Sequence, residues 1–293
     1  MIMIARFPSL RLVIISLSML FVAGCASSTR SGAVAGDRSQ LMLTDSASLN
    51  AEATQAYAEL LDDARQKKAL NTDPKLLARA RTIMNRIAPQ TAFFRPDAPH
   101  WDWEVNVIKS DDLNAFCYPG GKMIVLSGIV TQLELTDDEL AAIMGHEITH
   151  ALREHSREQQ SQGLLVSLLA AFARTKIGNI ADYAGQVYML SNSRTAETEA
   201  DRIGIELMAR AGYNPNAAVT LWEKMYQASG SRSGISWLST HPSPTDRINV
   251  LKQDTQTVWP LYEAAKAEQA KNPQVTKSAA TRPVRQTRTI NRR

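Results

Sequence analysis

The pentapeptide His-Glu-Ile-Thr-His at 146–150 constrains this chain more than any other stretch. It lies within 136–158, where a Thr and three acids open a run with helical spacing of apolar residues, so we predict one long helix there. Residues four apart share one face of a helix, so His146 and His150 can reach one metal ion, with Glu147 beside them. The pattern predicts a zinc site with its own base.

A catalytic zinc site needs three protein ligands, because a lone pair of His can simply be hydrogen-bonded or solvated. A second predicted helix, opening at Glu197 and running to about Ala211, offers the missing acid. Glu197 and Asp201 share one face of that helix, so Glu197 can bind the metal while Asp201 accepts a hydrogen bond from a ligand His. Glu199 points to the opposite side and is expected to be a solvated charge.

These elements resemble the HtpX and CAAX-protease family of gluzincin metalloproteases, peptidase family M48. The resemblance rests on the pentapeptide at 146–150, on the pair Glu197 and Asp201, and also on Ser193-Arg194, 114–125 and 240–247. It extends over about 49–251. The segment 114–125 is similar to the strand-turn-strand of the periplasmic branch that includes the LoiP and BepA lipoproteins, and the segment 240–247 resembles its C-terminal motif. We expect that branch without the BepA repeat domain.

The resemblance implies an α+β fold, a mainly helical gluzincin-type zinc metalloprotease domain with a small antiparallel sheet beside the zinc helix. Apolar and polar residues alternate from Trp103, and Pro119-Gly120-Gly121 supplies a turn before 122–126, which agrees with such a sheet. An edge strand beside the metal would bind an extended substrate through backbone hydrogen bonds. Further helices are predicted at 49–70, 73–87 and from 214 to about 228.

One Zn²⁺ per chain is expected, held by His146, His150 and Glu197, with Asp201 fixing the tautomer of a ligand His. Glu147 is expected to be the general base, because it lies near the metal without binding it.

The roles of His241 and Arg247, which belong to the C-terminal motif, stay open. Either side chain could stabilise the oxyanion. His241 could instead occupy the open coordination position in a latent state, and a purely structural role for its His-Pro turn is an equal alternative.

Residues 1–24 have the features of a lipoprotein signal peptide, with a basic start and an apolar stretch too short to span a membrane. Val22-Ala23-Gly24-Cys25 matches the lipoprotein box, so we expect a lipid on Cys25; an ordinary signal with an incidental Cys is the alternative. Ala26 follows, where an Asp would favour the inner membrane. The expected location is the outer membrane, facing the periplasm.

The remaining chain divides by composition. Residues 25–48 are rich in Ser, Ala and Gly and are expected to form a flexible tether to the metalloprotease domain at 49–263. Residues 264–293 carry eight Lys or Arg against one Glu, which predicts a disordered basic tail. The net charge of +4 therefore comes from the tails, and an anionic membrane surface is a better partner for the tail than nucleic acid.

The predicted function is a membrane-anchored zinc endopeptidase that cleaves unfolded or misassembled envelope proteins. Two alternatives remain. An outer-membrane protein assembly factor could use the same fold with little proteolysis, and a non-peptidase zinc hydrolase could use the same metal. Glu147 and a ligand set that leaves one position open argue for the peptidase.

Overall fold

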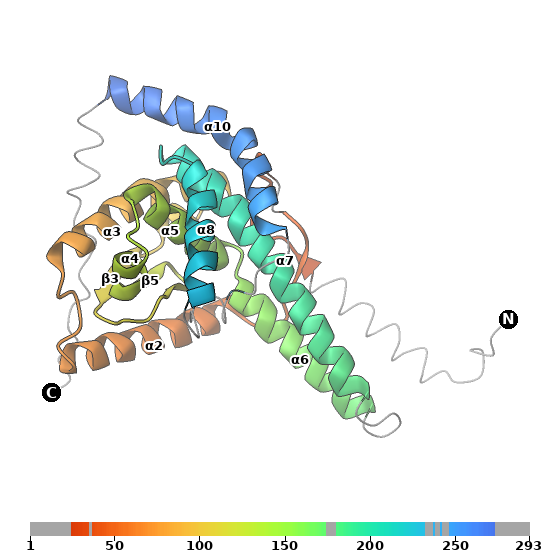
Figure 1. The fold of residues 1–293 in the computed structure, drawn as a ribbon. Helices are drawn as coiled ribbons and strands as arrows, with labels where there is room; N and C mark the ends of the chain where they lie inside the picture. Colours follow the sequence, from red (N-terminus) through yellow and green to blue (C-terminus); the bar gives the residue numbers. More distant parts are fainter. Residues whose placement is uncertain are drawn as a thin grey trace, which may run out of the picture.

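The computed structural model describes residues 25–34, 37–173, 180–231, 237, 241 and 246–272. In these ranges the chain is mainly helical, with one three-stranded sheet beside the helices (Figure 1). In chain order the elements are β1 (Cys25–Ala26), β2 (Gln40–Leu41), α2 (Ser46–Gln66), α3 (Pro74–Ile87), the 3₁₀ helices η1 (Ala88–Phe93) and η2 (Ala98–His100), β3 (Glu104–Ile108), β4 (Ala115–Tyr118), β5 (Lys122–Leu126), α4 (Ser127–Gln132), α5 (Asp137–Leu152), α6 (His155–Ala173), α7 (Ile180–Arg210), α8 (Asn216–Ser231) and α10 (Arg247–Lys271).

The three-stranded sheet has the order β3-β5-β4, which makes β4 an edge strand. β4 and β5 form the expected antiparallel hairpin, but β5 runs parallel to β3. The sheet is therefore mixed, and the expectation of a purely antiparallel sheet is corrected in this respect. The chain reverses direction twice, from β3 to β4 and from β4 to β5, so β5 regains the direction of β3.

Two predicted helix boundaries are wrong. The helix expected over 136–158 is two helices, because α5 ends at Leu152, α6 begins at His155, and Glu154 between them has a φ of 50°. That value lies in the left-handed region and turns the chain out of the helix. The second error concerns Glu197, which lies inside α7 rather than at the start of a helix.

The main core lies between α3, α5, α7, α8 and the sheet. α3 buries the apolar stripe that its helical spacing predicts, and α5 is buried on nearly all sides. Its apolar side chains fill the centre of the domain, and they include Leu140, Ile143, Met144 and Ile148.

The backbones of α5 and α7 touch at two glycines. A Cβ atom on Gly145 would lie 2.8 Å from the carbonyl oxygen of Gly204, and one on Gly204 would lie 2.8 Å from the backbone nitrogen of His146. These separations are too short for real side chains, so the helices can approach this closely only where neither residue has one. The contact brings the middle of α7 against the zinc motif of α5.

The segment expected to be a flexible tether, 25–48, packs on the domain in its described part. We call residues 25–34 and 37–45 the N-terminal arm. β1 pairs with β2, and Gln40 and Val34 are buried. Glu206 of α7 accepts hydrogen bonds from the backbone nitrogens of Ala33 and Val34 at 2.7 and 3.3 Å. Buried acceptors on the domain therefore order a segment that composition alone describes as a spacer.

α10 extends to Lys271 and so includes the first residues of the segment predicted to be a basic tail, while 273–293 lie outside the described residues. The apolar run 163–173 belongs to α6, which packs along α7 and extends with it away from the sheet (Figure 1). Of the helices in the described residues, none has both the length and the apolar character needed to cross a membrane.

We predict that Gly145→Ala and Gly204→Ala each lower the free energy of unfolding by about 1–3 kcal/mol, because a methyl group forces the two helices apart. This corresponds to a decrease in Tm of about 2–12 °C for a domain of this size. Gly163→Ala in α6 is the matched control, since a Cβ there meets nothing within 4 Å and Ala favours a helix. Equal Tm changes for Gly163→Ala and Gly145→Ala would contradict the close-contact explanation.

Candidate metal centre

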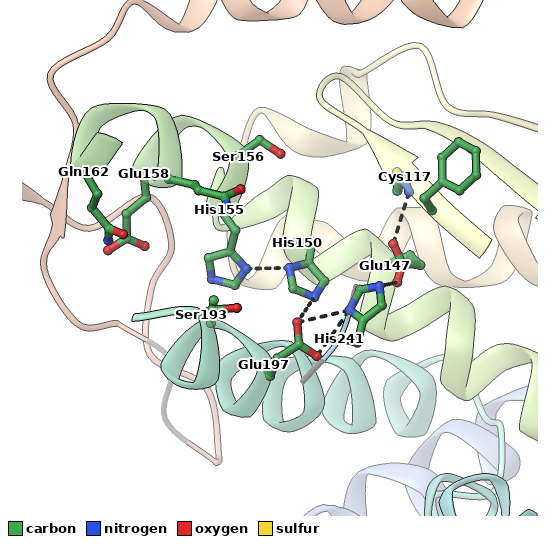
Figure 2. A pocket seen from close by; sticks show the side chains of 13 residues that line it. Cys117, Glu147, His150, His155, Ser156, Glu158, Gln162, Ser193, Glu197 and His241 are labelled. Carbon is green, nitrogen blue, oxygen red and sulfur yellow. Dashed lines mark hydrogen bonds and ion pairs between the residues drawn. The ribbon is translucent and has the colours of Figure 1, made fainter. Parts of the chain in front are cut away.

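α5 and α7 bring together the residues that the sequence singled out as metal ligands, of which Figure 2 shows His150 and Glu197. The Nε2 atoms of His146 and His150 lie 3.1 Å apart. One carboxylate oxygen of Glu197 lies 3.4 Å from the Nε2 of His146, and the other lies 3.4 Å from the Nε2 of His150. Two imidazoles and one carboxylate thus converge from two helices.

This triangle of donor atoms fits a zinc ion. Zinc binds nitrogen and oxygen ligands at about 2 Å, so donor atoms at two corners of a tetrahedron lie about 3.3 Å apart. One donor atom from each of His146, Glu147, His150 and His241 also lies within 4.8 Å of the others. We favour Glu197 over Glu147 as the acidic ligand, because each of its oxygens faces one ligand His whereas one oxygen of Glu147 accepts a backbone hydrogen bond.

The structure places Asp201 and Arg247 behind His146. Asp201 Oδ1 lies 3.0 Å from the Nδ1 of His146, which directs the opposite ring nitrogen toward Glu197. Arg247 lies 2.5 and 2.6 Å from the two oxygens of Asp201, and its guanidinium stacks over the ring of Trp222. Arg247 is buried and does not line the pocket at the metal centre.

The other histidine expected to bind the metal, His150, has a second histidine behind it. Its Nδ1 lies 2.9 Å from the Nδ1 of His155, and the Nε2 of His155 lies 3.0 Å from Glu199 (Figure 2 shows the two rings side by side). Glu199 is only 8% exposed, so the expectation of a solvated charge is wrong. Arg153 and Arg38 contact Glu199 at 3.2 and 2.7 Å, and Arg38 belongs to the N-terminal arm that covers this face of α7.

Glu147 lies deep in the site with its two oxygens in different surroundings. Oε2 accepts a hydrogen bond from the backbone nitrogen of Cys117 in β4 at 3.2 Å. Oε1 is buried without a hydrogen-bond partner among the described residues, and the Nε2 of His241 lies 3.4 Å from it. Burial raises the pKa of Glu147. A buried carboxylate with one oxygen uncommitted is suited to accept a proton.

His241 lies inside the same cluster. Its Nδ1 is 3.0 Å from Glu197 and 3.3 Å from the Nε2 of His146, and its ring stacks on Trp237 with centroids 4.2 Å apart. His241 therefore reaches the fourth corner of the donor set. Neighbouring residues 242–245 lie outside the described part of the chain.

The pKa values of the ionisable side chains in the cluster are shifted in different directions. Burial lowers the pKa of His146, but its hydrogen bonds to Asp201 and Glu197 outweigh this effect and raise the pKa to about 9. Burial lowers the pKa of His150, which is therefore neutral at pH 7. Burial raises the pKa of Glu197, and the surrounding histidines more than offset that, so its net pKa is below the usual range. Three carboxylates close to these rings make the site a strong attractor for a divalent cation.

A pocket of about 240 Å³ opens beside these residues. α5 and α6 line one side, α7 the other, and β4 the end next to Glu147 (Figure 2). Phe116 and Cys117 of β4 contribute to its wall. Cys117 is half-buried, and burial raises the pKa of its thiol, which fits a packing role better than that of a nucleophile.

Sequence reasoning missed three residues at the site. On a continuous helix, a residue five positions after His150 faces away from the ligands, so the spacing does not point to His155. No motif in the sequence points to Arg38 or Arg153. A signal for Arg153 was its place one residue after the helix that carries the zinc motif, where the chain has to leave that helix. No local pattern marks Arg38, which lies 120 residues from its partner Glu158.

Comparison with known proteins agrees with this geometry. The model of Peptidase family M48 matches residues 74–255, more than half of the chain. The chain belongs to peptidase family M48. It is 33% identical to the mitochondrial metalloendopeptidase OMA1 of Schizosaccharomyces pombe over 210 residues, which cover 69% of this chain and 59% of that protein. It is 34% identical to the beta-barrel assembly-enhancing protease of Escherichia coli K12 over 170 residues, which cover 53% of this chain and 35% of that protein.

Membership of family M48 confirms the metalloprotease class, the dependence on zinc and the mainly helical fold expected from the sequence. The relatives include mitochondrial and bacterial proteins, so the periplasmic lipoprotein branch stays a prediction. The chain spans about three fifths of the first relative and about a third of the bacterial one.

The pKa of His146 predicts how this M48 domain binds zinc as pH changes. Below pH 9 the ring holds a proton in the metal-free protein, and zinc must displace it. The apparent zinc affinity should therefore rise about tenfold per pH unit between pH 7 and 8.5, with about one proton released per ion. Chelator competition at several pH values measures this. A His with an ordinary pKa near 6.5 would instead give a flat affinity above pH 7.5.

Proposed function

We propose that this chain is a zinc-dependent endopeptidase that cleaves unfolded or misassembled envelope proteins from a lipid anchor in the outer membrane, facing the periplasm. The observation that carries the peptidase assignment is the triangle of donor atoms from His146, His150 and Glu197, with the uncommitted oxygen of Glu147 beside it. A purely structural zinc site would have no need for a buried carboxylate outside the donor set.

In this proposal His146, His150 and Glu197 hold the zinc ion. Zinc in such a site polarises a carbonyl group and lowers the pKa of water to about 7. Asp201 accepts the Nδ1 proton of His146 and so presents Nε2 to the ion. Arg247 does not itself line the pocket, but it contacts both Asp201 and Glu197, the latter at 3.4 Å, and so holds these carboxylates in place. Its position favours support of Asp201 over contact with substrate.

Glu147 moves the proton. Its Oε1 takes a proton from the attacking water, and the raised pKa of the buried carboxyl group lets it keep the proton until the leaving amine accepts it. The backbone nitrogen of Cys117 holds Oε2 and fixes the orientation of the carboxylate during this transfer.

The position of His241 supports two of the roles considered for it, a fourth metal donor in a latent state and an oxyanion stabiliser. Its Nδ1 is near enough to His146 and Glu197 to be a fourth donor in a latent state, and its Nε2 faces Glu147. His241 also lines the pocket, where its ring could stabilise an oxyanion instead.

β4 offers the surface for an extended substrate. The carbonyl of Tyr118 accepts from Gly121 and that of Asn114 accepts from Leu126, so these residues face β5. Alternation along an antiparallel strand then directs the carbonyls of Ala115 and Cys117 to the open edge. Backbone pairing at this edge makes little demand on sequence, which suits unfolded proteins as substrates.

The location rests on the lipoprotein box that ends at Cys25. β1 begins at this residue, and the N-terminal arm binds the domain directly after it. A lipid at Cys25 would therefore hold the catalytic domain close to the membrane surface, with little free chain between them. The similar protease of Escherichia coli is named for enhancing beta-barrel assembly, which supports misassembled proteins as substrates.

The first prediction tests the catalytic base. Glu147→Gln keeps the size of the side chain but removes the basic carboxylate, so cleavage of casein should fall by at least about 100-fold while bound zinc stays at one per chain. Glu59→Gln on the exposed face of α2 is the control and should cleave at the wild-type rate. Equal cleavage by Glu147→Gln and wild type would exclude the peptidase mechanism. An inactive wild type with bound zinc would favour the assembly-factor alternative.

The second prediction tests the anchor. Cys25→Ser should abolish labelling by a fatty-acid analogue in bacterial cells and release the protein from the membrane fraction, because the lipid supplies the membrane affinity. Cys117→Ser is the matched control, since its thiol lies inside the domain. Unlabelled wild-type protein in the soluble fraction would overturn the anchor.

A further inference from the structure

We propose that His155 and Glu199 are positioning residues for the ligand His150, and that Arg38 of the N-terminal arm completes this support. The inference rests on the proposed function, in which His150 binds zinc through Nε2. It assigns to the N-terminal arm a part in the metal centre, although the arm lies before the region matched by the family.

The hydrogen-bond chemistry has one consistent solution. His150 presents Nε2 to the donor set, so its proton is on Nδ1. That proton is donated to the Nδ1 of His155, 2.9 Å away, whose own proton must then be on Nε2. The Nε2 proton of His155 is in turn donated to Glu199 at 3.0 Å. An ionised Glu199 therefore selects the tautomer of His155, which selects that of His150.

Two arginines stabilise the negative charge of the Glu199 carboxylate. Arg153 is fully buried, and its Nη2 lies 3.2 Å from Glu199 and also donates to the carbonyl of Arg38. Its Nη1 donates to Ser27 and Thr29. The Nε of Arg38 lies 2.7 Å from Glu199. All the partners of Arg153 other than Glu199 in these contacts come from the N-terminal arm.

Arg38 is fixed in this position by a second acid. Its two terminal nitrogens donate to the two oxygens of Glu158 in α6 at 2.6 and 2.8 Å. Gln40 of the arm donates to the same carboxylate and to the carbonyl of Arg153. Such a fork of two parallel bonds leaves Arg38 little freedom, so its Nε stays against Glu199.

Each of the two proposed ligand histidines is thus oriented by its own pair of an acid and an arginine. Asp201 and Arg247 hold His146, and Glu199 with Arg38 holds His150 through one additional ring. Loss of a hydrogen-bond partner behind a metal-bound His typically weakens metal binding by about 10–100-fold. We expect that range for removal of the acceptor on His155.

The test measures zinc affinity of the metal-free full-length protein by chelator competition, with the absorption spectrum of the cobalt-substituted protein as a second readout. His155→Leu should weaken zinc binding by about 10–100-fold and alter the cobalt spectrum, because His150 loses its acceptor. His155→Gln offers an amide oxygen in place of the ring nitrogen and should recover most of the affinity. Equal losses for Leu and Gln would show a packing role and overturn the inference.

Arg38 is tested against a matched arginine. Arg157 also binds the N-terminal arm, through the carbonyl of Thr44 at 2.7 Å, but its acid partner is Glu154 rather than Glu199. Arg38→Gln should weaken zinc binding severalfold, and Arg157→Gln should leave it unchanged. Unfolding of the metal-free variants by circular dichroism identifies any that fail to fold. Equal zinc affinities for the two folded variants would remove the arm from the metal centre.

Failure of the proposed function has a different signature. His150→Ala should lose most of the zinc if His150 is a ligand. A wild-type protein that binds no zinc, or a His150→Ala variant that binds it normally, would refute the ligand set. Normal binding by His155→Leu beside a defective His150→Ala would refute the positioning role alone.

Discussion

The metal centre depends on the contact between the backbones of α5 and α7 at Gly145 and Gly204. Gly145 directly precedes His146, and Gly204 lies one helical turn after Asp201, so the point of closest approach is beside the donor set. A wider separation would leave Glu197 too far from both Nε2 atoms to share an ion with them. Packing of two helices thus sets the distance on which the chemistry relies, and the core behind them keeps that distance constant.

The second constraint is charge. Glu147, Glu197 and Asp201 are all buried within one cluster, and unpaired carboxylates at that depth would strongly oppose folding. Arg247 offsets part of the charge beside Asp201, and the proton on His146 offsets another part when no metal is bound. A divalent cation can replace that proton and add one further positive charge. The electrostatics of the folded chain and its affinity for zinc are therefore two aspects of the same arrangement.

Local sequence patterns predicted those features of the site that are determined within a single helix. The capping box of Thr136 and Glu139, the four-residue spacing of the two ligand His, and the shared face of Glu197 and Asp201 all follow from helical geometry. Glu199 was misjudged because periodicity tells which face a side chain occupies but not what covers that face. The mixed sheet, the α5–α6 break and the Gly145–Gly204 contact likewise depend on partners that are distant in the sequence.

The N-terminal arm shows why composition can mislead. Few large apolar side chains and many Ser, Ala and Gly residues describe a chain that cannot build a core of its own. Order here comes instead from the domain, where Glu206, Glu158, Ser161 and the carbonyl of Arg153 are hydrogen-bond partners for the arm. Without the arm, the buried Arg153 would lose the oxygens of Ser27, Thr29 and Arg38. A buried guanidinium without acceptors is costly, so the domain stabilises the arm and the arm completes the domain.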